Sequence, residues 1–551
     1  MASPYRPRTD LETHEVTNQP PPRLDSNAFA DNAALRDALK AAGGEGHVGA
    51  LTAFGAKTDS EEGRELSRAA QENPPKLKSF DRYGQRLDEV EFHPAYHELM
   101  RYGLEGGVSA AAWNADEAGH VLHASLLYLM SGLDAGVCCP MSMTYAAVPA
   151  LRTDPDIAAR WEPLIRAGKY DGRFLPAEEK TGVTIGMAMT EKQGGSDVRA
   201  NTTKAEKTAD GYLLTGHKWF CSAPMSDAFL TLAYAQGGLT CFLVPRWRPD
   251  GTRNPIHIMR LKDKLGDRSN ASSEIEYHGA WAERLGEEGK GVRTIIQMVQ
   301  HTRLDCIAGS AGGMRAAFTE AVWHTAYRSA FQKKLIDQPA MRSVLTDLAL
   351  ESEAATALMI RVARSFDLAA STPHEAALMR IATPIAKYWI CKRQPGFVYE
   401  ALECFGGVGY VEEGPMPRLF RQSPLNAIWE GSGNVIALDV LRALSREPEA
   451  MDALRTELLT AKGAHPLYDA HLARLEAWAK PGALTETTAR AFVEEQALGL
   501  QAAALHLYAT EEVFAGFCAA RLDPENRHLA YGALPAGINQ DRIIARALPI
   551  S

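Results

Sequence analysis

The sequence predicts an α+β protein in which one β-rich domain lies between helical regions. Short apolar segments bounded by turn residues, which are typical of strands, gather between residues 180 and 285. Alanine-rich helical stretches precede them, and apolar residues at the spacing i, i+3, i+4 and i+7 follow them. With 551 residues the chain is too long for one hydrophobic core, so several structural units are expected.

The first 180 residues are expected to form an arm and a helical domain. Residues 1–30 are polar and contain several prolines, which favours an extended arm. Residues 31–180 contain alanine-rich stretches such as Val108–Trp113 and His123–Met130, and alanine favours helix. We therefore expect an N-terminal helical domain over 31–180.

Residues 181–285 are expected to form the β-domain. The segments with strand character are Gly211–His217, Ala228–Tyr234, Leu239–Val244 and Ser273–Tyr277. Gly237 and Gly238 lie between the second and the third of these segments, which predicts a hairpin.

Helical periodicity returns near residue 290 and continues to the end of the chain. The residues at this spacing are Val292, Ile295, Ile296 and Val299, and then Met341, Val344, Leu345 and Leu348. We expect a helical bundle over residues 286–444. Residues 445–551 are rich in alanine and leucine, which predicts an extra C-terminal helical domain.

The composition favours a soluble, cytoplasmic enzyme. Hydrophobic residues make up 46% of the chain and charged residues 23%, as in globular proteins. The net charge of −9 argues against a protein that coats nucleic acid through its overall field. The sequence has neither an apolar signal region nor a run of 18 apolar residues, and its eight cysteines form no C-x-x-C pair. We therefore expect reduced thiols and no membrane span.

Four segments carry the chemistry, and the first is the loop Met189–Asp197. Gly194 and Gly195 allow backbone N–H groups to approach a ligand closely, and Thr190 and Ser196 add hydroxyl donors. Such a loop suits the edge of a polar ring or a phosphate. A loop that simply needs glycine has the same pattern.

The second and third segments are Lys218–Pro224 and Cys404–Tyr410. Trp219 could lie against a planar cofactor, with backbone groups of 221–223 at its edge, or it could belong to the core. The glycines of Cys404–Tyr410 are similar to a dinucleotide fingerprint, but a helical pattern rather than a strand precedes them. We expect them to let a helix end approach a ligand or a neighbouring subunit.

The fourth segment is Asn426–Asn434, in which Glu430 stands beside a glycine-rich turn. A carboxylate there can face a pocket, because glycine gives the backbone unusual freedom. Together with the loop Met189–Asp197, it predicts a flavin site with a carboxylate base.

In this order and spacing the four segments resemble the acyl-CoA dehydrogenase superfamily, over residues 90–440. Met189–Asp197 resembles its M-T-E-x-x-x-G-S-D loop, Trp219–Ser222 its W-[IF]-x-[ST] strand, Gly406–Tyr410 its G-G-x-G-[YF] segment and Trp429–Gly431 its [YW]-E-G turn. The resemblance is closer still to the AidB branch, the flavoproteins of the adaptive response to DNA alkylation. The segments that add this likeness are Thr13–Pro20, Glu191–Val198, Arg260–Gly266, Arg268–Ser272 and Ile428–Asn434.

The resemblance implies an acyl-CoA dehydrogenase-like fold with a small β-barrel domain, and FAD bound between that domain and the bundle. Glu430 stands at the position of the catalytic base, which takes a proton from the carbon α to a thioester while flavin N5 accepts the β-hydride. The implied cofactor-binding residues are Met189, Thr190, Gly195, Ser196, Trp219, Phe220, Cys221, Ser222, Arg328, Gly406, Gly407, Ile428, Gly431, Ser432 and Asn434. The implied partners are an acyl-CoA or related thioester and further copies of the chain in a homotetramer.

Two positions depart from the pattern of the superfamily. Its R-x-x-F-G-x-P segment, which helps to bind FAD from the adjacent subunit, reads here Arg328–Lys334 and lacks the glycine and the proline. This puts the local turn in doubt. Glu403 stands where most relatives have glutamine, as in the AidB branch.

A second hypothesis is that the chain binds double-stranded DNA, as the AidB branch implies. Arg442 and Arg446 are the candidate contacts. Residues 443–551, however, contain ten Lys or Arg residues and fourteen Asp or Glu residues, whereas DNA-binding domains are usually basic. We therefore rank the enzyme first.

Other kinds of site are not expected. Ala308–Gly312 is similar to a nucleophile elbow but lies in a helical pattern. His120 and His123 are isolated and belong to no H-E-x-x-H motif, so we expect no metal site.

Overall fold

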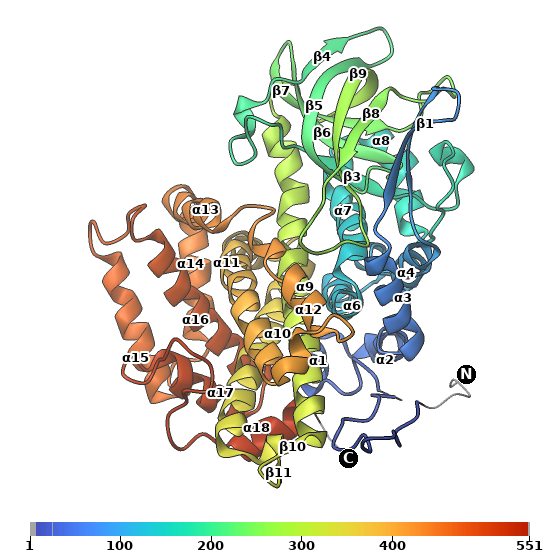
Figure 1. Cartoon of the computed structure of the whole chain (residues 1–551). Helices are drawn as coiled ribbons and strands as arrows, with labels where there is room; N and C mark the ends of the chain where they lie inside the picture. The colour runs from blue at the N-terminus through green and yellow to red at the C-terminus, as the bar shows by residue number, and fades with distance from the viewer. Residues whose placement is uncertain (1–6, 25, 549–551) are drawn as a thin grey trace.

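The computed structural model describes residues 7–24 and 26–548, and shows a β-domain standing on a body of helices (Figure 1). The N-terminal helices lie on one side of this body and the C-terminal helices on the other. Helix α9 (Gly291–Tyr327) runs from the β-domain to the opposite end. This arrangement confirms the predicted α+β fold class. Among the described residues we find no helix with the length and apolar character of a membrane span.

The N-terminal region is mainly helical, as predicted. Its α-helices are α1 (Ala33–Ala41), α2 (Val48–Thr58), α3 (Glu61–Glu72), α4 (Pro94–Glu105), α5 (Ala111–Asn114), α6 (Gly119–Leu133), α7 (Ala135–Leu151) and α8 (Pro155–Arg166). The antiparallel hairpin of β1 (Lys76–Phe80) and β2 (Arg86–Glu91) was not predicted. Charged residues interrupt both strands, so the hairpin lacks the apolar run that predicts a strand.

The described part of the N-terminal arm packs against the far end of α9. The Asn18 side chain donates to the carbonyl of Ser329 (2.9 Å), and Arg23 forms ion pairs with Asp59 (2.6 Å) and Glu320 (2.9 Å). The arm is therefore held by the helices, which its polar, proline-bearing sequence did not indicate. The rest of the predicted arm, residues 1–6 and 25, lies outside the described residues.

The β-domain is a small barrel. Its strands are β3 (Ile185–Ala188), β4 (Lys204–Lys207), β5 (Tyr212–Ser222), β6 (Ala228–Ala235), β7 (Gly238–Pro245), β8 (Ile256–Leu261) and β9 (Ser272–Leu285). They pair in the order β3-β6-β4-β5-β9-β7, and an additional β6–β7 pairing closes the sheet. The four predicted strands and the hairpin at Gly237–Gly238 are confirmed. The short strands β3, β4 and β8 were missed.

The bundle consists mainly of long helices. With α9 it contains α10 (Pro339–Leu368), α11 (Pro373–Glu403), α12 (Met416–Gln422) and α13 (Gly433–Arg446). Helices α9 and α11 run side by side in the same direction, because Cys391 donates to the carbonyl of Cys306 (3.4 Å) and, further along, Phe405 stacks on His324 (4.4 Å between ring centroids). One end of each helix therefore lies near the barrel and the other at the opposite end of the molecule.

Buried ion pairs join the C-terminal helices to the bundle. These helices are α14 (Pro448–Leu459), α15 (Pro466–Leu475), α16 (Ala489–Tyr508), α17 (Glu511–Phe517) and α18 (Gln540–Ala547). Arg521 pairs with Asp347 (2.5 Å) and Glu351 (3.0 Å) of α10, and Arg546 pairs with Glu353 (2.8 Å). Our division of the chain at residues 180, 285 and 444 remains a proposal.

Candidate functional site

Glu430 lies in a strained turn between a short 3₁₀ helix (Leu425–Ala427) and α13. Its φ of +58° is left-handed, which costs a non-glycine residue about 1–3 kcal/mol. Two cations hold the turn. Arg303 of α9 donates to the carbonyl of Glu430 (3.1 Å), and Lys387 of α11 donates to the carbonyls of Trp429 (2.8 Å) and Gly431. The bundle therefore fixes the direction of the glutamate side chain.

The Glu430 carboxyl group has the environment of a general base. Its Oε2 atom is buried and has no hydrogen-bond partner among the described residues. Burial raises the pKa of Glu430, although the Thr302 hydroxyl, Arg303 and Lys387 oppose the shift in part. A carboxylate with a raised pKa and a free oxygen is suited to accept a proton.

Trp429 anchors the turn to α9 through a relay of side chains. Its indole N–H donates to Asn426 Oδ1 (2.8 Å), and the Asn426 amide donates to the Ser310 hydroxyl (3.1 Å). The adjacent Ile428 is 62% exposed and leaves the surface beside the turn apolar.

The first two predicted segments meet in the structure. The backbone N–H of Trp219 on β5 donates to the carbonyl of Thr190 (2.8 Å). Glu191 fixes the loop, because its carboxylate accepts from Lys218 Nζ (2.9 Å) and from the Thr203 hydroxyl (2.6 Å). Its charge is retained: burial opposes ionisation, but Lys218 and the hydroxyl donors lower the pKa of Glu191 to about 2. Met189 and Thr190 are half-buried, and the loop beyond Gly195 and Ser196 is exposed.

Two aromatic rings of β5 are available to a planar ligand. Phe220 is 50% exposed, Trp219 is half-buried, and Lys262 Nζ lies 3.2 Å from the centroid of the Trp219 ring. The Cys221 side chain is buried in the barrel, so of this residue only the backbone could reach a ligand.

The end of β5 and the Glu430 turn both approach Cys139 on α7. Burial raises the pKa of the Cys139 thiol to about 12, and the charge of Glu430 adds to this rise while the Ser222 hydroxyl opposes it. Ser222 also contacts the Ser272 hydroxyl (3.2 Å). Ser222 and Glu430 therefore both act on the same buried thiol of α7.

The start of α13 presents polar groups beside this turn. Ser432 and Asn434 are exposed, and no side chain caps the helix. Lys392 of α11 approaches so closely that a Cβ atom on Gly433 would lie 3.0 Å from its Nζ. Arg490 of α16 donates to Asn434 Oδ1 (3.3 Å).

Three predicted cofactor residues lie elsewhere in the chain. Arg328 follows the end of α9, and Gly406 and Gly407 follow the end of α11. The residues of α9 from Thr302, beside Glu430, to its end at Tyr327 span about 38 Å at 1.5 Å per residue. Within one chain, Arg328, Gly406 and Gly407 therefore form a second cluster, separate from the Glu430 turn.

The hairpin after Arg328 keeps a tight turn without glycine. Ser329–Ala330 pairs with Lys333–Lys334, and the two residues between them, Phe331 and Gln332, have φ values of +51° and +63°. Both are left-handed, as a two-residue hairpin turn of this type requires. The loss of glycine therefore adds strain, but the turn is kept.

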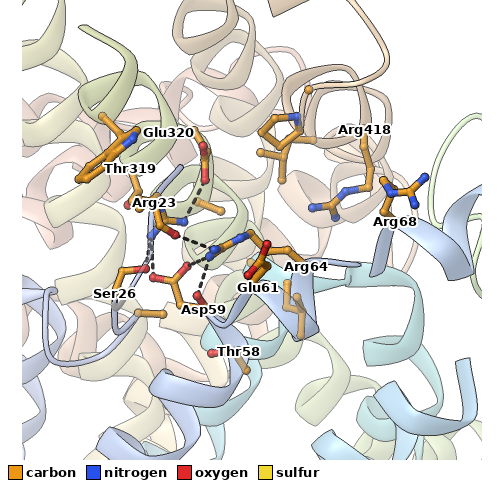
Figure 2. A pocket seen from close by; sticks show the side chains of 18 of the residues that line it. Arg23, Ser26, Thr58, Asp59, Glu61, Arg64, Arg68, Thr319, Glu320 and Arg418 are labelled. Carbon is orange, nitrogen blue, oxygen red and sulfur yellow. Dashed lines mark hydrogen bonds and ion pairs between the residues drawn. The ribbon is translucent and has the colours of Figure 1, made fainter. Parts of the chain in front are cut away.

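A wide cavity of about 1540 Å³ lies close to this second cluster (Figure 2). The N-terminal arm, α3, α9 and α12 contribute to its walls, which include His324 and Phe405. Arg23 crosses it to Asp59 and Glu320, and Arg68 and Arg418 face it. Glu430 does not line this cavity.

Arg442 and Arg446, the candidate DNA contacts, lie on α13 and are exposed. Among the ion pairs of the described residues, neither has a carboxylate partner. By contrast, Arg521 and Arg546 of the C-terminal region are engaged by carboxylates of α10.

The residues that hold the turn and the loop were not among the predicted site residues. Thr302, Arg303, Lys387 and Glu191 are all nearly or completely buried. The only signal in the sequence was that Arg303 and Lys387 interrupt apolar helical patterns, where a charge is usually solvated.

Comparisons with known proteins agree with this architecture. Residues 18–172 match the AidB N-terminal domain of the adaptive response protein, 186–280 the middle domain of acyl-CoA dehydrogenases and 289–445 their C-terminal domain. The chain is 46% identical to AidB of Escherichia coli (strain K12) over 84% of this chain and 86% of that protein. It is 33% identical to acyl-CoA dehydrogenase family member 11 of Caenorhabditis elegans over 72% of this chain and 66% of that protein.

Two solved structures have the same fold over nearly the whole chain. Bd2924 in its apo form has a TM-score of 0.81 and 30% identity, and covers 90% of this chain and 100% of its own. ACDH-11 of Caenorhabditis elegans, solved in complex with C11-CoA, has a TM-score of 0.83 and 26% identity, and covers 98% and 97%. The chain therefore belongs to the acyl-CoA dehydrogenase family, and within it to the AidB-like branch.

Proposed function

We propose that this protein is an FAD-dependent acyl-CoA dehydrogenase in which Glu430 is the catalytic base. One observation carries the proposal: burial raises the pKa of Glu430, and its buried Oε2 has no partner among the described residues. By contrast, Glu191 and Glu351 each have a carboxylate oxygen paired with a cation. A strained backbone at Glu430 is also typical of a functional site.

The residues present fit FAD. The exposed ring of Phe220 and the half-buried ring of Trp219 suit the flavin ring, and Thr190 with the exposed glycine loop supplies polar contacts at its edge. The uncapped start of α13, with no acidic residue in its first turn, suits a phosphate group. When bound, FAD supplies the acceptor for the hydride that leaves the β carbon.

The protein supplies the proton acceptor and its orientation. Arg303 and Lys387 hold the turn so that the Glu430 carboxylate can take the α-proton of the thioester. The backbone N–H of Glu430 is positioned by the same turn and is expected to donate to the thioester oxygen as negative charge develops there. Burial raises the pKa of Glu430, and Thr302, Arg303 and Lys387 limit that rise.

A complete cofactor site requires a second copy of the chain. Arg328 lies about 38 Å along α9 from Thr302 at the Glu430 turn, and Gly406 and Gly407 lie beyond the end of α11, about 24 Å along that helix from Lys387. They can contact a cofactor at Glu430 only if they come from a neighbouring subunit. Exposed apolar residues near them, including Val408 (59%) and Tyr410 (83%), favour such an interface. We propose a homotetramer, in which each pair of subunits completes two sites.

The test uses Glu430→Gln, which keeps the shape of the side chain and removes the base. Wild-type protein should be yellow and should lose its flavin absorbance when a suitable acyl-CoA is added without oxygen. Glu430→Gln should bind FAD equally well but bleach at least about 100-fold more slowly. Glu449→Gln, an exposed position on α14, is the matched control. Equal bleaching rates for Glu430→Gln and wild type would show that Glu430 is not the base.

Double-stranded DNA binding is the second candidate function. The observation in its favour is that Arg442 and Arg446 are exposed on one helix and have no ion-pair partner in the described chain. Phosphate contacts should make the affinity fall steeply with salt. A gel shift at physiological salt tests it: binding that Arg442→Ala and Arg446→Ala do not weaken would remove these residues from the interface.

A further inference from the structure

The extra C-terminal region places one arginine in the neighbourhood of the catalytic turn. Arg490 lies in the first turn of α16 and points at the start of α13. Its Nε donates to the Tyr388 hydroxyl (3.1 Å) and one terminal nitrogen donates to Asn434 Oδ1 (3.3 Å). Asn434 lies four residues after Glu430, so the C-terminal region is in direct contact with the site.

A second cation, Lys392, lies beside Arg490. It is on α11 one turn after Tyr388, with its Nζ 5.2 Å from the centroid of the Tyr388 ring, and it also faces Gly433. Burial lowers the pKa of Lys392, and the positive charges of Arg490 and Lys387 lower it further. Two cations therefore share this place and repel one another.

No carboxylate offsets these charges. Among the described residues, neither Arg490 nor Lys392 has a carboxylate within ion-pair distance. Other arginines that join the C-terminal helices to the bundle, such as Arg521 and Arg546, do have such partners. Arg490 is exposed and Lys392 is half-buried, so an anion from outside the chain can reach both cations.

We propose that Arg490 and Lys392 bind the diphosphate group of a nucleotide ligand at Asn434, so that the extra C-terminal domain is itself part of the ligand site. A diphosphate carries at least two negative charges and several acceptor oxygens, which matches a planar guanidinium beside an ammonium group. Both FAD and coenzyme A carry this group. The inference rests on the proposed function and adds to it a contact from a domain outside the dehydrogenase core.

The experiment measures ligand affinity in the full-length protein. Apoprotein is titrated with FAD and, separately, with riboflavin, which has no phosphate, and the quenching of flavin fluorescence gives the two Kd values. Holoprotein is titrated with coenzyme A by calorimetry. The variants are Arg490→Ala, Lys392→Ala and the charge-conserving Arg490→Lys. Arg455→Ala, an exposed arginine on α14, is the matched control. Circular dichroism establishes that each variant is folded.

If FAD is the source of the diphosphate, Arg490→Ala and Lys392→Ala should each weaken FAD binding about tenfold or more, leave riboflavin binding unchanged, and Arg490→Lys should restore part of the loss. If coenzyme A is the source, the same pattern should appear in its Kd and FAD binding should stay at the wild-type value. Kd values for both ligands equal to those of Arg455→Ala would overturn the inference while leaving the proposed function intact. A wild-type protein that binds neither ligand would overturn both.

Discussion

Replacing Lys387 by methionine tests whether the bundle holds the catalytic turn. Lys387 is 1% exposed, and its ammonium group donates to the carbonyls on either side of Glu430. Methionine keeps most of the volume of the side chain but leaves those two carbonyls without their donor. Because hydrogen bonds to charged groups contribute about 1.5–3 kcal/mol each and part of this is regained through water, we expect a loss of about 2–4 kcal/mol in the free energy of unfolding.

The same change should shift the pH dependence of catalysis. The charge of Lys387 lowers the pKa of Glu430 against the larger effect of burial, so its removal should raise that pKa. Only the ionised carboxylate can accept the proton, and the rate of flavin bleaching rises with pH through the pKa of Glu430. The rising limb of the pH–rate profile should therefore move to higher pH.

Urea denaturation and stopped-flow bleaching at a series of pH values measure the two effects. Lys462→Met, at an exposed position after α14, is the control and should change neither. A Lys387→Met protein with wild-type stability would show that these hydrogen bonds do not hold the turn. A rising limb that stays in place or moves to lower pH would contradict the proposed electrostatic role.

Two further predictions concern buried ion pairs. Glu191→Gln should destabilise the protein by about 3–5 kcal/mol in urea denaturation, since Lys218 is left buried without its partner. Because the pKa of Glu191 is depressed to about 2, the stability that it contributes should be present above about pH 4 and lost as the pH falls toward 2; a wild-type curve without this decline would contradict the assignment. Arg521→Ala should cost a similar 3–5 kcal/mol, because Asp347 and Glu351 lose their shared cation. If instead the C-terminal helices became protease-sensitive while the bundle kept its stability, the two parts would unfold separately.

The sequence alone predicted the fold class and the two segments that contain Thr190 and Trp219. Turn-bounded apolar runs predicted the barrel, and within it the Trp219 backbone N–H donates to the Thr190 carbonyl although β3 and β5 are not paired strands. The hairpin Lys76–Glu91 could not be predicted in this way, because it packs with charged side chains exposed and has no apolar run. Periodicity detects burial and not every strand is buried.

The residues that hold the site were harder to predict for a different reason. Arg303 and Lys387 lie in helical patterns, where a charged residue is usually on the solvated face. Their partners are backbone carbonyls of a turn more than 40 residues away from Lys387, and no local pattern encodes such a partner. Likewise, Arg328 and Gly406 follow the ends of α9 and α11, and the length of these helices places both residues far from Glu430 in the same chain.

Helix α9 has a consequence for genetics. It carries Thr302 and Arg303 beside the base, and at its other end it leads to Arg328. In the proposed assembly each chain contributes halves of two different sites, so two inactive variants could repair one another. Co-expression of Glu430→Gln with an Arg328 variant should form mixed oligomers in which one site receives both intact halves. Recovery of activity in that mixture, from two parents that lack it, would be complementation between alleles of a single gene.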